Sequence, residues 1–282
     1  MTIVVACSSA SPAPTTTTTT APAPAASAGA TTTTVEPTTL PGSEGFHTRR
    51  PGTLIIGTER LERPWYIGPS AELVTGGFEF DLASELARRL RVPSIQVVQS
   101  SLVLMMTGQD CKCDVMLGGI TITDARARAL DLSEPYLGAD QGVVVRKGTV
   151  VDSVAAAAAL RWAVTLRNPT GIEVIRTRVK PSTEPEVVVN NADGVRLLAE
   201  GRVDALMLET PDALVIAEAN PALAVAGQFR TGEQYALALS LGSPNTALIN
   251  DVIREMRNDG TVDLLLRAYF GVEPANVPAI PP

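Results

Sequence analysis

Beyond residue 52, short apolar segments alternate with longer segments in which apolar residues recur every three or four positions. The short segments predict buried β-strands at 54–57, 95–98, 114–117, 143–145, 163–166, 186–189, 205–208 and 236–239. The longer ones predict amphipathic helices at 81–90, 170–178, 192–200, 211–218 and 246–259. Gly201 and Gly260 follow two of these helices, as left-handed caps require. The alternation predicts an α/β chain without a repeat period.

The N-terminal segment has a different composition. Residues 8 to about 39 are almost only Thr, Ala, Pro and Ser, which cannot bury enough apolar surface to become ordered. Cys7 closes the sequence Val-Val-Ala-Cys, which matches a bacterial lipobox, or else it is an incidental cysteine. We therefore expect a partial signal and lipobox at 1–7 and a flexible tether at 8–51, with Cys7 as the lipidation site.

Charge and cysteine content exclude several classes of function. The chain has 282 residues and a formal net charge of -7, and its Lys and Arg residues form no basic stripe, so we expect no nucleic-acid partner. Cys111 and Cys113 could form a tight disulfide in an oxidising compartment. A metal site is disfavoured because these two thiols have no neighbouring histidine, and His47 is the sole histidine. We expect neither metal nor cofactor.

The most informative stretch runs from Gly118 to Arg126. Gly118 and Gly119 follow an apolar strand and allow a ligand to approach the backbone closely. Thr123 is a candidate N-cap for a short helix that carries Arg126, whose planar guanidinium can bind a carboxylate through two hydrogen bonds. The alternative is that Arg126 only decorates a polar helix and that the glycines only make a turn.

Segments across the whole chain strengthen the binding interpretation. The stretch 118–136 (GGITITDARARALDLSEPY) resembles the signature of the amino-acid-type solute-binding proteins of bacterial ABC importers. The resemblance to this family extends to the segments 52–58, 77–83, 165–171, 204–209 and 257–261. The resemblance implies a type II periplasmic-binding-protein fold with two lobes, each a mixed sheet flanked by helices. It places lobe 1 at 52–137 and 235–271, lobe 2 at 138–234 and a Pro-rich tail at 272–282, with the ligand in the cleft between the lobes.

The resemblance also assigns the two charged ends of an α-amino acid. Arg126, Thr121 and the backbone of Gly118 and Gly119 would hold the carboxylate. Glu209, at the tip of a strand, would receive the ammonium, unless it is a cap-like carboxylate beside the following helix. The turn of the second lobe would close over the ligand through Arg167, Thr170 and Gly171.

Ligand selection would fall to Glu59, Glu62 and Trp65, which follow the first strand. Glu59 argues against acidic ligands and favours a basic or amide side chain. Arg60 and Arg63 are adjacent and could neutralise either carboxylate, so the charge of this subsite stays open.

The resemblance implies a lipid-anchored, extracytoplasmic, monomeric receptor that delivers a small-molecule amino acid to an ABC permease in the membrane. The same fold could instead sense an amino acid for a membrane signalling partner. In some bacteria it also hosts a cyclohexadienyl dehydratase, whose chemistry needs a poised carboxylic acid such as Glu209, Glu173 or Glu59. We expect a binding protein, not an enzyme.

Overall fold

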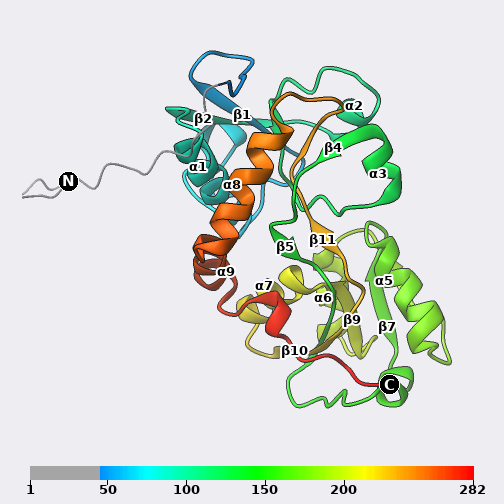
Figure 1. The fold of residues 1–282 in the computed structure, drawn as a ribbon. Coiled ribbons are helices and arrows are strands. Elements are labelled where there is room, and N and C mark those ends of the chain that lie inside the picture. Colours follow the sequence, from blue (N-terminus) through cyan, green and yellow to red (C-terminus); the bar gives the residue numbers. More distant parts are fainter. Residues whose placement is uncertain (1–44) are drawn as a thin grey trace, which may run out of the picture. The chain divides into compact units, whose positions relative to one another are not determined.

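The computed structural model describes residues 45–282, which contain two five-stranded sheets and a two-stranded ladder (Figure 1). One sheet has the strand order β2-β1-β3-β12-β4 and forms lobe 1. The other has the order β10-β6-β9-β7-β8 and forms lobe 2. The ladder pairs β5 with β11 and joins the lobes. Cys7 and most of the predicted tether lie outside the described residues.

The sheet of lobe 1 is mixed. Its strands are β1 (Thr53–Thr58), β2 (Ser94–Gln99), β3 (Val115–Met116), β4 (Leu130–Leu132) and β12 (Ala238–Ser240). Both neighbours of β1 run parallel to it, whereas β12 is antiparallel to β3 and β4. Five of the six residues of β1 are buried, because apolar side chains cover both faces of this sheet.

Helices cover lobe 1 on both faces. They are α1 (Phe78–Arg89), α2 (Leu102–Met106), α3 (Asp124–Ala129), α8 (Thr246–Asn258), α9 (Thr261–Phe270) and a 3-10 turn at Ala71–Leu73. Residues of α1, α8 and α9 share one apolar cluster with alternate residues of β1. Met105 of α2 belongs to a cluster on the other face, together with Cys111 and Cys113. These two cysteines form a disulfide, as the sequence allowed.

Lobe 2 is also a sheet between two helical layers. Its strands are β6 (Gln141–Arg146), β7 (Trp162–Thr165), β8 (Glu186–Val188), β9 (Ala205–Glu209) and β10 (Leu223–Phe229). Its helices are α4 (Val154–Ala158), α5 (Pro169–Val174) with a π-helical turn at Ile175–Val179, α6 (Asn191–Ala199) and α7 (Thr210–Ala219). Val143 and Val145 point into one core cluster and Val144 into another. The period of two along a strand therefore fills both faces.

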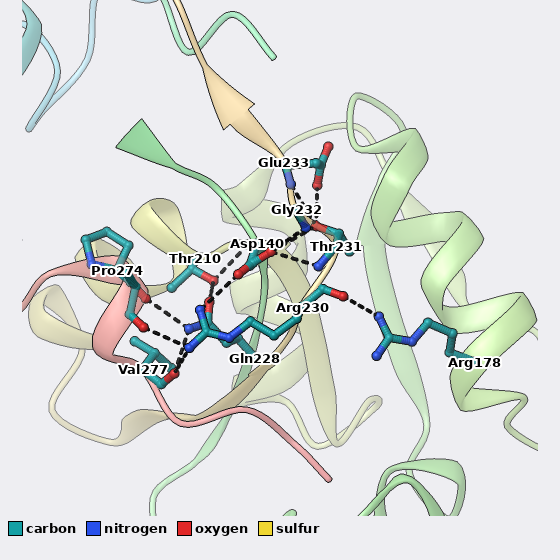
Figure 2. Close-up of polar contacts among 11 residues, drawn as sticks. Asp140, Arg178, Thr210, Gln228, Arg230, Thr231, Gly232, Glu233, Pro274 and Val277 are labelled. Atoms are coloured by element: carbon teal, nitrogen blue, oxygen red, sulfur yellow. Dashed lines mark hydrogen bonds and ion pairs between the residues drawn. The ribbon is translucent and has the colours of Figure 1, made fainter. Parts of the chain in front are cut away.

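The two lobes are connected through β5 (Leu137–Gly138) and β11 (Gln234–Tyr235), which run antiparallel. Figure 2 shows the polar contacts at the lobe 2 end of this connection. The Asp140 carboxylate accepts hydrogen bonds from the backbone N–H groups of Thr231 (2.7 Å) and Gly232 (2.8 Å). Arg230 forms an ion pair with the same carboxylate at 3.0 Å. One carboxylate therefore joins the two crossing segments.

The C-terminal segment also passes from lobe 1 to lobe 2. After α9 it forms a 3-10 turn at Pro274–Asn276 and then runs beside β10. Gln228 donates its backbone N–H to the Pro278 carbonyl and accepts from the N–H of Ile280, both at 2.9 Å. Ile280 is buried in the core of lobe 2. The Pro-rich tail is therefore packed against that lobe.

The predicted strands and helices all have counterparts in the structure, with ends that differ by up to three residues. Positive φ angles at Gly201 (71°) and Gly260 (79°) confirm the predicted caps. The sequence prediction missed β10, whose segment Leu-Ala-Val-Ala-Gly-Gln-Phe is rich in small residues, and α9, which begins directly after Gly260. It also missed the short elements α2, α4 and β4. No described helix is both long and apolar enough to cross a bilayer.

Candidate functional site

A cavity of about 650 Å³ lies between the two lobes. Loops at the carboxyl ends of β1 and β3 contribute to its wall from lobe 1, and the ends of β7, β8 and β9 contribute from lobe 2. Crevices at the carboxyl ends of strands are the usual ligand sites of α/β folds. Eight sequence-predicted residues line it: Glu59, Glu62, Gly118, Gly119, Thr121, Arg126, Arg167 and Glu209.

Arg126 reaches the cavity from the short helix α3. The Thr123 hydroxyl accepts a hydrogen bond from the Arg126 backbone N–H at 3.3 Å, so Thr123 is the predicted N-cap. The Arg126 side chain donates one bond to the Thr121 carbonyl, at 2.6 Å. Burial lowers the pKa of Arg126, while the Glu59 carboxylate opposes this shift. Arg126 thus presents a partly desolvated guanidinium to the cavity and does not simply decorate the surface.

The Gly118-Gly119 turn is held by a buried carboxylate. Gly119 has a φ of 64°, and a Cβ there would lie 2.9 Å from Nη1 of Arg60. Its N–H donates to Glu79 Oε1 at 2.8 Å, so this amide is not free for a ligand carboxylate. Glu79 also accepts from the Tyr136 hydroxyl at 2.6 Å, and burial raises the pKa of Glu79. Glu79 therefore fixes the shape of the turn.

Glu209 is the last residue of β9 and precedes α7. It occupies the N-cap position of that helix, but its side chain makes no capping hydrogen bond. Burial, followed by the nearby Asp212 charge, raises the pKa of Glu209 to about 7. Its carboxylate therefore faces the cavity in a site where ionisation is costly unless a cation arrives. This geometry disfavours the alternative that Glu209 is only a helix cap.

Arg60 turns into the cavity and is the main feature that the sequence left undecided. Its guanidinium forms ion pairs with Asp212 of α7 and with Glu62, the latter at 3.0 Å. It also lies over the Trp65 ring, 4.4 Å from the centroid. Asp212 additionally accepts a hydrogen bond from the Trp65 indole at 3.2 Å. The positive charge of Arg60 is thus matched inside the protein.

Three predicted site residues lie elsewhere. Trp65 is fully buried and packs against Phe78 and Phe270 in the core of lobe 1. Thr170 donates its hydroxyl to Glu233 at 2.7 Å, and the Gly171 N–H donates to the Asn168 side chain at 2.8 Å. Thr170 and Gly171 do not line the cavity. Their donors are already used by groups of lobe 2 and of the connection between the lobes.

The cavity also contains residues that the sequence prediction missed. These include Gln99, Asn190, Asn191, Asp212 and Tyr235. Asp212 lies three residues after Glu209, in the first turn of α7. Acidic residues are common at this position of a helix, so the sequence alone did not indicate a role in the site. Among residues 45–282 no group of three or more His, Cys, Asp or Glu side chains could hold a metal ion.

Comparison with known proteins gives a consistent result. Residues 54–272 match the model of the bacterial extracellular solute-binding proteins, family 3. The L-cystine-binding protein TcyJ of Escherichia coli (strain K12) is 28% identical over 237 residues, which cover 79% of this chain and 84% of that protein. The lysine/arginine/ornithine-binding periplasmic protein of the same strain is 24% identical, covering 78% of this chain and 88% of that protein.

Solved structures agree in fold. An ancestral arginine-binding protein bound to glutamine is 30% identical, with a TM-score of 0.61, and the match covers 80% of this chain and 100% of that one. An ancestral cationic amino acid solute-binding protein is 28% identical with a TM-score of 0.65, covering 78% and 96%. The fold is the two-lobed type II periplasmic-binding-protein fold. The chain belongs to the bacterial extracellular solute-binding proteins of family 3.

Proposed function

We propose that the protein is an extracytoplasmic receptor that binds a polar L-amino acid, with a basic or amide side chain, for import by an ABC transporter. The observation that carries this proposal is the pair Arg126 and Glu209, which reach one cavity from opposite lobes. Arg126, with the Thr121 hydroxyl, binds the α-carboxylate, and Glu209 binds the α-ammonium. A ligand held by both lobes stabilises the closed cleft.

The charge of the subsite beside Glu59 supports the choice of side chain. Arg60, which could have attracted an acidic ligand, is paired with Asp212 and Glu62. Glu59 uses one carboxylate oxygen to accept the Leu102 N–H at 2.9 Å, and its other oxygen is open to a donor. A basic or amide side chain supplies that donor, whereas a dicarboxylate brings like charges together. The relatives named for lysine, arginine, ornithine and glutamine support the same class.

The surroundings of the receptor belong to the same proposal. Cys7 carries a lipid that anchors a monomeric protein to the outer face of the cell membrane. The predicted tether ended at residue 51, but Phe46 packs against the core of lobe 1 and the Arg49 N–H donates to Asp114, so only the residues before Phe46 serve as the tether in this proposal. An ABC permease takes up the ligand. Globomycin, which blocks lipoprotein signal cleavage, should then cause an unprocessed precursor to accumulate, and Cys7→Ala should release the protein from the membrane.

One observation favours a second candidate, an enzyme of the cyclohexadienyl dehydratase type. Glu209 has a pKa of about 7, as a general acid needs, and one similar structure, 28% identical, is described as a precursor of such an enzyme. Glu173, by contrast, is exposed and does not line the cavity. Incubation with prephenate or arogenate tests this candidate, and we expect no product.

The binding proposal is tested by a thermal-shift screen of the proteinogenic L-amino acids, followed by calorimetry. A ligand that binds only the folded state at a concentration 100 times its Kd stabilises it by about 2.7 kcal/mol. We expect arginine, lysine or glutamine to raise the melting temperature and aspartate and glutamate to have little effect. If the dicarboxylates give the largest shift, Arg60 is available to the ligand and the proposed side-chain preference is wrong.

A further inference from the structure

The charged side chains of the cavity fall into two groups. Glu62 and Asp212 each form an ion pair with Arg60. Within the part of the chain that the structure describes, the other charged residues of the cavity wall form no ion pair, and these are Arg126, Arg167, Glu59 and Glu209. Two cations and two anions are therefore available to a ligand.

The α-amino acid head assigned above uses only half of this set. Arg126 and Glu209 bind its carboxylate and ammonium, so Arg167 and Glu59 are left without an ion-pair partner. Arg167 lies just beyond the end of β7, which runs parallel to β9 and its terminal Glu209. Both residues are exposed in this structure. Closure of the cleft around a ligand would remove water from them, and a desolvated charge without a counter-charge is costly.

We propose that the distal end of the ligand is a second α-amino acid head, so that the preferred ligand is a diamino dicarboxylic acid. This inference rests on the proposed function, because it assumes that Arg126 and Glu209 hold the first head. The second head places its carboxylate on Arg167 and its ammonium on Glu59.

Simpler ligands satisfy these two residues less completely. A lysine side chain gives Glu59 a cation but leaves Arg167 unpaired. A glutamine side chain gives hydrogen bonds without charge, and a glutamate side chain pairs Arg167 but leaves Glu59 facing an anion. The cavity of about 650 Å³ also offers the side-chain amides of Gln99, Asn190 and Asn191 for further hydrogen bonds. The double head matches this set of charges best.

The ligand pair that tests the inference is L-cystathionine and L-ethionine. Both are thioethers of homocysteine with the same first head, but ethionine lacks the second amino and carboxyl groups. Neither contains a disulfide, so thiol exchange with the Cys111–Cys113 disulfide does not interfere. L-lysine serves as a ligand with a distal cation only. Calorimetry on the wild-type protein should give cystathionine an affinity about tenfold or more above that of ethionine and of lysine.

Arg167→Gln and Glu59→Gln test the residues. In each variant, the ratio of cystathionine affinity to ethionine affinity should fall by about tenfold. The matched control is Arg176→Gln, which changes an exposed arginine of the same lobe outside the cavity wall and should keep the wild-type ratio.

The outcomes separate this inference from the proposed function. If Arg167→Gln weakens cystathionine, ethionine and lysine by the same factor, Arg167 clamps the first carboxylate, and the second-head inference is overturned while the receptor function stands. Equal affinities of the wild-type protein for cystathionine and lysine would overturn the second head in the same way. If no amino acid binds at all, the proposed function is wrong, and this inference, which rests on it, is wrong as well.

Discussion

The cavity wall and the connection between the lobes differ in how their charged side chains are paired. At the connection, Asp140 is paired with Arg230 and receives two backbone N–H groups (Figure 2). Glu233 accepts hydrogen bonds from Gln141 and Thr170. In the cavity, Arg126 and Glu209 are half-buried and form no ion pair with any residue of the described range 45–282. Polar groups that are internally satisfied stabilise the fold, whereas unsatisfied ones are available to a ligand.

This difference explains why Thr170 is not in the cavity. Sequence position places it on the turn that faces the cleft, but its hydroxyl donates to Glu233, which belongs to the connection. Removing a charge from the cavity should therefore reduce ligand affinity, and removing one from the connection should reduce the free energy of unfolding.

Arg126→Ala should have the largest effect. The variant leaves the desolvated ligand carboxylate without its guanidinium, which costs about 2–5 kcal/mol of binding free energy. Calorimetry with L-arginine measures the loss. Arg128→Ala is the control, since Arg128 lies on the same helix, is exposed and does not line the cavity. Affinity like that of the wild type in Arg126→Ala would remove this residue from the site.

Glu209→Gln should come next. The variant keeps the shape of the side chain but cannot carry the anion, so we expect an affinity loss of about 1.5–3 kcal/mol. Its effect on stability has the opposite sign. Because the pKa of Glu209 is raised to about 7 in the folded state, the empty protein loses stability as the pH rises from the usual carboxyl pKa to about 7, and the full loss is present at pH 8. The variant should therefore be at least as stable as the wild type at pH 8. A variant that unfolds at lower temperature at pH 8 contradicts this account.

The pH dependence of binding follows from the same carboxyl group. A bound ammonium favours ionised Glu209, so binding near pH 7 releases a proton, and affinity decreases as the pH falls below about 7. The decrease is at most about tenfold per pH unit. Calorimetry in buffers of different ionisation enthalpy measures the protons released, and Glu209→Gln should abolish the release. Persistence of the release in that variant would assign it to another group.

Asp140→Asn probes the connection. Burial alone would raise the pKa of Asp140, but the Thr231 and Gly232 amides and Arg230 lower it overall. Its stabilising contribution is therefore present above the usual carboxyl pKa and is lost as the pH falls through the lowered value. We expect the variant to lose about 1–3 kcal/mol of unfolding free energy at pH 7. Asp152→Asn, at an exposed site, is the control in chemical denaturation.

Thr170→Val should have the smallest effect. It removes the hydroxyl that donates to Glu233 and should cost about 1 kcal/mol of unfolding free energy, with ligand affinity almost unchanged. Denaturation and calorimetry on the same preparation separate the two quantities. If affinity falls while stability is retained, Thr170 contacts the ligand after all, as the sequence had suggested.

The fold could be predicted because its signals are local and because family motifs extend along most of the chain. Apolar periodicity located β1 and α8, and Thr123 and Gly260 marked helix ends through their own chemistry. These features need no knowledge of distant residues.

The charge pairing could not be predicted, because it joins residues far apart in the chain. Arg60 meets Asp212 across 152 positions, and Thr170 meets Glu233 across 63. Trp65 follows the first strand in sequence, but its ring turns into the lobe 1 core. Only the three-dimensional structure distinguishes a satisfied charge from an available one.

The central claim is that Arg126 and Glu209 hold the two ends of one amino-acid head. The most direct measurement is a cycle that combines protein variants with ligand analogues. L-argininamide lacks the carboxylate of L-arginine, and δ-guanidinovalerate lacks its α-ammonium. Calorimetry of wild type, Arg126→Ala and Glu209→Gln with all three ligands gives the coupling between each residue and each group.

The wild-type protein should bind both analogues more weakly than L-arginine. Arg126→Ala should no longer distinguish argininamide from arginine, and Glu209→Gln should no longer distinguish δ-guanidinovalerate from arginine. Each variant should still respond to the other analogue. Independent, purely additive losses in every arm of the cycle would contradict the account, because they would mean that neither residue contacts the group assigned to it.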